Sequence, residues 1–213
     1  MSIIDNRFFL YAYCYLYNAK YYLKYAKNKN SALNSKKSYL IHVPKAAGTS
    51  VCSALEVVDP GHFVLTDTEA ENCTSPLIVY RDPVDRIVST FKYAKNDNHA
   101  KINSPLWLVN RFDSVEKFVC SNAFSVFAKK HYFFRHQHLM ISKKAIEFSN
   151  CKVIRFSHVG KDFYEIYGIR LGNKNVSMGG RESTSDVGEL LANKIKNIYS
   201  KDYEFFEEIG VNP

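Results

Sequence analysis

Apolar residues fall into short continuous runs separated by longer stretches with helical spacing. The short runs are rich in β-branched and aromatic residues, and an unbroken run of this kind is typical of a strand buried on both faces. Strands are therefore predicted at 38–43 (SYLIHV), 61–66 (GHFVLT), 76–80 (PLIVY) and 151–156 (CKVIRF).

The stretches between and after these runs place apolar residues three to four positions apart, which predicts helices. The clearest begins after 76–80, because Asp82 is a candidate N-cap, Pro83 fits the first turn, and Ile87 and Phe91 share one face. Further helices are predicted at 49–58, 114–134, 160–168 and 185–210, the last as one helix or two. The alternation predicts a three-layer α/β fold, a parallel sheet with helices on both faces.

Residues 1–36 differ from the rest of the chain and are predicted to form an aromatic, lysine-rich helix followed by a linker at 27–38. The apolar core of this helix is about half the length of about twenty residues that a bilayer-spanning helix needs. No small-residue cleavage site of a signal peptide follows it. Residues 7–27 either lie on a membrane surface as an amphipathic helix or pack on the domain at 37–213 with their tyrosine hydroxyls in water.

Composition narrows the class of partner and the compartment. A length of 213 residues fits one α/β domain, and a net charge of +8 suits an anionic partner such as a nucleotide, an acidic glycan, a membrane or nucleic acid. The plain alternative is a lysine-rich composition without such a partner. The five cysteines are scattered without a C-x-x-C pair, which argues against a zinc site and a disulfide framework. Reduced thiols indicate a cytoplasmic location.

The turn after the first predicted strand carries the first candidate chemistry. In PKAAGTS (44–50), a lysine, a glycine and two hydroxyl residues lie between a strand and a helix. Backbone N–H groups and the dipole at a helix N-terminus bind anions, so this turn predicts a phosphate site. Lys45 precedes Gly48, whereas in a Walker A loop the lysine follows the glycines, so an ATP or GTP loop fits poorly.

A second candidate element, RDPVDRIVSTF, follows the strand at 76–80 and carries Arg81 and Ser89. Together with PK-x-x-GTS it resembles the two phosphate-binding elements of sulfotransferases that use 3′-phosphoadenosine 5′-phosphosulfate (PAPS). The resemblance is to the carbohydrate type, in particular the heparan and uronyl 2-O-sulfotransferases. It extends over about residues 38–210 and includes VIRFSHVGKDFYEIYGI and KIKNIYSKDYEFFEEIG. It implies the P-loop NTPase-like sulfotransferase fold.

The resemblance implies a role for each matching residue. Lys45 would stabilise the phosphate that leaves the sulfur, and Arg81 with Ser89 would bind the 3′-phosphate. Arg181, in the glycine-rich loop 177–183, would touch a phosphate, although a loop without a contact is an equal alternative. Ala46 replaces a threonine common in the family. The 5′-phosphate cradle would consist of Ala47, Gly48, Thr49 and Ser50.

The acceptor hydroxyl needs a general base, and histidine accepts a proton near neutral pH with the least adjustment. His62 resembles the catalytic histidine of the 2-O enzymes, although Pro60 stands where those relatives carry a second histidine. His42, inside the first predicted strand, is interpreted as a core or supporting group. The family's acceptor-side segment is matched by His136, Gln137 and His138.

The sequence therefore predicts transfer of a sulfuryl group from PAPS to a hydroxyl of a carbohydrate acceptor, with PAPS as co-substrate and no metal. The acceptor is expected to be anionic, with no nucleic-acid partner and with peripheral membrane contact through 7–27 as an open alternative. The rival hypotheses are a kinase-like or non-catalytic nucleotide-binding P-loop protein and a single-strand nucleic-acid binder. The pattern defines neither the acceptor nor the oligomeric state.

Overall fold

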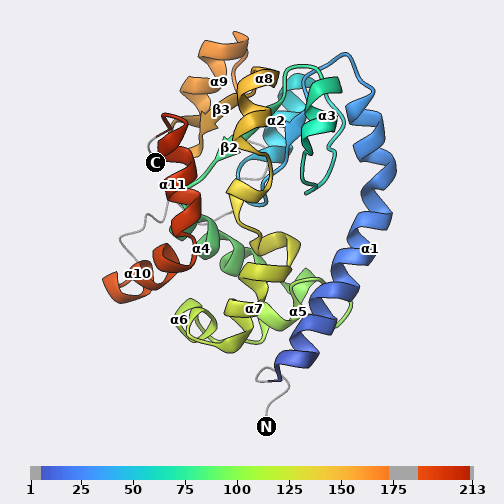
Figure 1. Ribbon diagram of the computed structural model, residues 1–213. Helices are drawn as coiled ribbons and strands as arrows, with labels where there is room; N and C mark the ends of the chain where they lie inside the picture. The colour runs from blue at the N-terminus through green and yellow to red at the C-terminus, as the bar shows by residue number, and fades with distance from the viewer. Residues whose placement is uncertain (1–5, 173–186, 212–213) are drawn as a thin grey trace. The chain divides into compact units, whose positions relative to one another are not determined.

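The computed structural model describes residues 6–172 and 187–211, which form a mixed α/β protein that is mostly helical and has a small parallel sheet (Figure 1). The chain divides into two compact units. Unit 1 takes the described residues of 1–21, 83–135 and 179–200, and unit 2 takes those of 22–82, 136–178 and 201–213. Each unit has its own hydrophobic core.

The sheet of unit 2 has three parallel strands in the order β1-β2-β3. These are β1 (Leu40–Ile41), β2 (Leu77–Tyr80) and β3 (Lys152–Arg155). Leu40 pairs with Leu77, and Leu77 pairs with Lys152. All four residues of β2 are buried, as expected for a central strand, whereas β3 buries only Ile154 fully. The prediction of a strand at 151–156 is confirmed, but its burial is that of an edge strand.

The strand predicted at 61–66 is wrong. These residues make only an isolated bridge, Leu65 with Ile141, in which the N–H of Leu65 donates to the carbonyl of Met140 at 2.8 Å. Gly61 has a left-handed φ of 79°, and its N–H bonds to the carboxylate of Asp59, so the segment forms a loop. Helix α3 (Asp67–Asn72) follows directly, and Thr66 and Glu69 cap it reciprocally.

The helices of unit 2 contact the sheet or one another. Helix α2 (Gly48–Leu55) packs beside β1, α9 (Val159–Tyr167) packs beside β3, and α3 lies beside α8 (Lys143–Ser149). The C-terminal stretch of the chain forms two helices, α10 (Glu189–Ile198) in unit 1 and α11 (Ser200–Glu208), most of which belongs to unit 2. Short 3₁₀ turns are η2 (Asp97–His99), η3 (Tyr132–Phe134), η4 (Gln137–Leu139) and η5 (Phe156–His158).

Unit 1 is helical and has an aromatic core. Its helices are α4 (Pro83–Ala94), α5 (Trp107–Asn110), α6 (Val115–Val119), α7 (Asn122–Lys130) and α10, with the first part of α1. Phe118 contacts Phe124, Phe127 and Phe134 with ring centroids 5.2 to 6.2 Å apart. Arg86 is fully buried and donates to the carbonyls of Phe133 and Arg135, at 3.3 and 3.0 Å.

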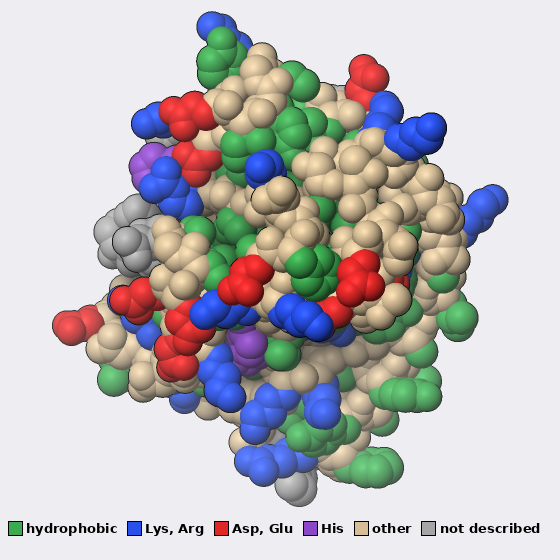
Figure 2. All heavy atoms as spheres, turned by 45° about the horizontal axis from the view of Figure 1, so that its top comes forward, with side chains coloured by type: hydrophobic (Ala, Val, Ile, Leu, Met, Phe, Trp, Pro, Cys, Tyr) green, Lys and Arg blue, Asp and Glu red, His purple; other side chains and the backbone are tan. Residues whose placement is uncertain are grey.

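Helix α1 (Arg7–Leu33) is longer than predicted, because it continues through 27–33 of the expected linker. Leu10, Tyr13 and Cys14 are buried in the core of unit 1. Of the two alternatives for residues 7–27, the structure therefore shows the helix that packs on the protein. Hydrophobic side chains nevertheless stand out from the surface along the edge where α1 runs (Figure 2). Over the described part of the chain, no helix is both long and apolar enough to cross a bilayer.

Candidate functional site

The turn between β1 and α2 has an unusual backbone. Lys45 and Ala47 both adopt left-handed φ angles, 63° and 59°, which cost a non-glycine residue about 1–2 kcal/mol each. Ala47 is the N-cap of α2 and makes no side-chain capping bond, so the start of the helix lacks the oxygen acceptor that Ser, Thr, Asp or Asn would supply. Strain together with an uncapped helix start is a combination found at ligand-binding turns.

Lys45 and Arg81 lie together at this turn. Nη1 of Arg81 donates to the carbonyl oxygen of Lys45 at 2.7 Å, and the guanidinium carbon lies 4.1 Å from the centre of the Phe156 ring. Burial lowers the pKa of Lys45, and the positive charge of Arg81 lowers it further. Two cations at adjacent strand ends repel each other, and bound anionic groups beside them would lower that cost.

Gln137 fixes the backbone of Arg81. Its Oε1 accepts from the Arg81 N–H at 3.1 Å, and its Nε2 donates to the Arg81 carbonyl at 2.8 Å. Gln137 is completely buried. An amide that is buried and bonded at both ends holds Arg81 in place, which differs from the substrate contact predicted for Gln137.

Beside the turn, His42 is held between Asp59 and Gly48. Its Nδ1 lies 2.7 Å from Oδ1 of Asp59, which also accepts the N–H of Gly61 at 2.9 Å. Burial opposes ionisation of Asp59, but the hydrogen bond and charge of His42 outweigh it and lower the pKa of Asp59 to about 2. The ring of His42 packs so closely on Gly48 that a Cβ there would lie 2.1 Å from it. This agrees with the interpretation of His42 as a supporting group.

His62 is anchored to the backbone directly after β1. Its Nδ1 lies 2.8 Å from the carbonyl oxygen of His42, and the two rings meet edge to face with centroids 4.4 Å apart. Because a carbonyl can only accept, Nδ1 of His62 carries the proton, and in the neutral ring Nε2 carries the lone pair. That is the tautomer that a general base requires.

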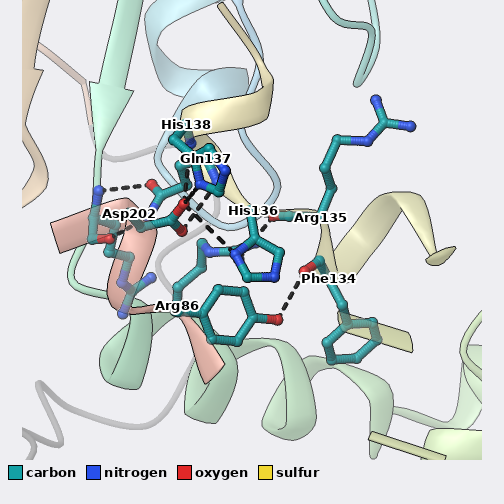
Figure 3. A network of polar contacts seen from close by, with 9 residues as sticks. Arg86, Phe134, Arg135, His136, Gln137, His138 and Asp202 are labelled. Carbon is teal, nitrogen blue, oxygen red and sulfur yellow. Dashed lines mark hydrogen bonds and ion pairs between the residues drawn. The ribbon is translucent and has the colours of Figure 1, made fainter. Parts of the chain in front are cut away.

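His136 and His138 meet at Asp202, which α11 contributes and which is completely buried (Figure 3). Oδ1 of Asp202 lies 2.7 Å from Nδ1 of His138 and 3.9 Å from Nδ1 of His136. Asp202 also accepts the N–H groups of Gln137 and His138, each at 3.0 Å. This carboxylate therefore fixes the segment that carries both histidines.

The same three side chains could hold a metal ion, since their ligand atoms lie within 4.8 Å of one another. Both oxygens of Asp202 already accept backbone N–H groups, however, and the separation of 2.7 Å from His138 is that of a hydrogen bond. We therefore interpret the group as structural support for the 136–138 segment.

For the remaining predicted site residues, the structure gives at most their element and their exposure. Thr49 is exposed and Ser50 is buried in the first turn of α2. Ser89 lies half-buried on α4, in unit 1, so its pairing with Arg81 stays a prediction. Arg181 lies outside the described residues.

Sequence reasoning missed Asp59, Asp202 and the positioning role of Gln137. The segment DPGH contained a weak signal, because an aspartate before Pro-Gly often bonds the backbone of its own turn. For Asp202, nothing in its surrounding sequence indicated a buried carboxylate.

Comparison with known proteins adds no relative to this geometry: no protein-family model, no curated protein and no solved structure matched the chain.

Proposed function

We propose that the protein is a sulfotransferase that moves a sulfuryl group from PAPS to a hydroxyl of a carbohydrate acceptor. The observation that carries the proposal is the meeting of Lys45 and Arg81 at the uncapped start of α2. Both cations follow the carboxyl ends of adjacent parallel strands, where open α/β sheets bind their ligands. The proposal includes the three-layer, P-loop NTPase-like sulfotransferase fold, of which the β1-β2-β3 sheet would form the central part.

The 5′-phosphate would lie at the N-terminus of α2. Backbone N–H groups of Gly48, Thr49 and Ser50 would donate to its oxygens, assisted by the helix dipole. Thr49 is exposed, and its hydroxyl would add a donor. The left-handed Lys45 and Ala47 shape the turn for this approach, which gives a reason for the strain they carry.

Lys45 would act on the leaving group. As the acceptor oxygen forms its bond to sulfur, the bond between sulfur and the bridging oxygen breaks, and negative charge develops on that oxygen. An ammonium group beside it stabilises the transition state more than the ground state, which is the effective form of catalysis. Adenosine 3′,5′-bisphosphate is then the product that leaves.

His62 would accept the proton of the acceptor hydroxyl. The bond from its Nδ1 to the His42 carbonyl orients the ring and leaves the lone pair on Nε2. Asp59 and His42 would act as positioning residues for this loop, since they tie Gly61 to the strand end. No metal is required, because Lys45, Arg81 and the α2 dipole supply positive charge.

The 3′-phosphate would be held by Arg81 with Ser89, and Arg181 would touch a phosphate. Arg81 presents a planar guanidinium with several N–H donors, which suits a bidentate bond to a phosphate. The acceptor would be an anionic glycan, with His136 and His138 at its side of the site. The alternative function is that of a kinase-like or non-catalytic nucleotide-binding protein.

The experiment is to incubate the purified chain with radiolabelled PAPS and a panel of glycan acceptors. Lys45→Ala and His62→Ala are compared with Lys144→Ala and His158→Ala, which change exposed residues of the same type. We expect transfer by the wild type and both controls, and its loss in both site variants. His62→Ala should still bind adenosine 3′,5′-bisphosphate. Retained transfer by Lys45→Ala would refute the mechanism, and nucleotide binding without any transfer would favour the alternative.

A further inference from the structure

Helix α1 carries two apolar stripes on different faces. Leu10, Tyr13 and Cys14 follow helical spacing and are buried in the core of unit 1. The second stripe has the same i, i+3, i+4, i+7, i+8 spacing and faces solvent. Its members, which we call the outer face, are Phe8, Tyr11, Ala12, Tyr15 and Leu16.

The residues of the outer face are more exposed to solvent than is usual for large apolar side chains. Phe8 is 83% exposed, Tyr15 74% and Leu16 64%. Scattered apolar residues are normal on a protein surface, but a continuous apolar stripe on one helix marks an interaction site. The stripe is not needed for the core, since the opposite side of the same helix supplies the core contacts.

Positive charge borders the outer face. Helix α1 contains no aspartate or glutamate in its sequence from Arg7 to Leu33, and Lys20 lies next to Leu16 on the helix surface. On the other side, a hollow of about 310 Å³ is lined by Tyr11, Tyr15, Asn18 and Lys130. Asn18 donates to the Lys130 carbonyl at 2.6 Å and accepts the Tyr132 N–H at 3.1 Å, so this border is fixed.

We infer that the outer face binds the surface of an anionic lipid bilayer, with Phe8, Tyr15 and Leu16 inserted at the acyl boundary. Lys20 and Lys130 would then reach the headgroups from either side, and a headgroup phosphate would occupy the hollow beside Tyr11. Aromatic and aliphatic side chains above a lysine-lined border are the composition of helices that lie in the membrane interface.

Charge favours this occupant over a second copy of the chain. Two outer faces packed together would bring lysines of like charge into contact, which is costly. Single-stranded nucleic acid would pair with the lysines and stack bases on the aromatic rings, but it would leave Leu16 exposed, because an aliphatic side chain has no ring on which a base can stack. The inference is independent of the proposed sulfuryl transfer.

The test is co-sedimentation of the full chain with vesicles of phosphatidylcholine alone and of phosphatidylcholine mixed with phosphatidylserine. We expect binding to the mixed vesicles and at least tenfold weaker binding to phosphatidylcholine alone. Leu16→Ser should weaken binding at least fivefold, while Leu190→Ser, a change at another exposed leucine, should not. Lys130→Ala should weaken it about fivefold, the effect of about 1 kcal/mol that one basic side chain contributes near an anionic surface.

Lys196→Ala removes an exposed lysine from α10 and should leave the affinity unchanged. Circular dichroism confirms that each variant is folded. No binding to either vesicle, or equal binding to both, would overturn the inference. Equal weakening by Lys196→Ala and Lys130→Ala would also overturn it, since binding would then follow net charge. Two further results would overturn the inference if vesicle binding is absent. One is dimerisation that depends on protein concentration and is abolished by Leu16→Ser, and the other is binding to single-stranded DNA that Leu16→Ser abolishes.

Discussion

Replacing Gly48 by alanine separates helix propensity from packing, because the two predict opposite signs. Alanine is the better helix former by up to about 1 kcal/mol, so propensity alone predicts a more stable protein. In the structure, the new Cβ would lie 2.1 Å from Cδ2 and Nε2 of His42 and 2.8 Å from Cε1. Contacts this short require the His42 ring to move.

His42 cannot move without loss. It is 8% exposed, and its Nδ1 is bonded to Asp59 at 2.7 Å. Overpacking a filled site costs about 1–3 kcal/mol, and losing a hydrogen bond to a charged partner costs about 1.5–3 kcal/mol. After subtraction of the helix term, Gly48→Ala should lower the free energy of unfolding by about 1.5–5 kcal/mol.

Urea denaturation at neutral pH measures this change. Gly160→Ala is the matched control, since Gly160 lies in the first turn of α9 and a Cβ added there would meet nothing within 4 Å, so alanine should be neutral or stabilising. In a His42→Ala background the contact is gone, so Gly48→Ala should no longer destabilise. A Gly48→Ala protein as stable as the wild type would refute the packing described for His42.

Three further variants test groups away from the nucleotide itself. The pKa of Asp59 is lowered to about 2, so the stability that its carboxylate contributes is present above pH 4 and is lost as the pH falls towards 2. Asp59→Asn should therefore lower the free energy of unfolding at pH 7 and have little effect near pH 2. Burial lowers the pKa of His131 to about 4, and its Nδ1 accepts the Phe133 N–H. Because the unfolded chain then binds a proton more readily, the free energy of unfolding should fall by up to about 1.4 kcal/mol for each unit that the pH drops between 6.5 and 4. His131→Asn should reduce that slope. Gln137→Glu places an oxygen against the Arg81 carbonyl and should cost about 2 kcal/mol in urea denaturation at neutral pH.

Each of these expectations has a contrary result. A difference between Asp59→Asn and wild type that persists unchanged to pH 2 would show that the carboxylate charge is not the cause. An unaltered pH slope in His131→Asn would assign the acid sensitivity to other groups. Wild-type stability of Gln137→Glu would mean that the Gln137 amide does not hold Arg81.

Much of the fold follows from local pattern. LIVY is unbroken and bounded by turn residues, and the DP pair starts a helix, so β2 and α4 were predictable. The segment 61–66 has a similar composition, but its backbone is turned by Gly61 and bonded to Asp59, which a strand pattern does not reveal. The capping box of Thr66 and Glu69 was present in the sequence and would have indicated α3.

The predictable part of the site was the pair of residues that follow the ends of neighbouring strands. Lys45 and Arg81 follow two parallel strands, and the adjacency of those strands brings them together. The tasks of Asp59, Gln137 and Asp202 depend on groups far away in sequence, which become their partners only after folding. These are the His42 side chain for Asp59 and backbone groups for the other two. Spacing in a single sequence contains no record of such pairs.

Calorimetric titration with adenosine 3′,5′-bisphosphate and with adenosine 5′-monophosphate tests the central claim most directly. The account predicts saturable binding of the bisphosphate, about ten- to a hundredfold weaker in Lys45→Ala, as expected for the loss of one charge-assisted bond. Arg81→Ala should weaken the bisphosphate by a similar factor and the monophosphate far less, because only the former carries a 3′-phosphate. Absence of binding by the folded wild type, or equal affinity of wild type and both variants for the bisphosphate, would contradict the account.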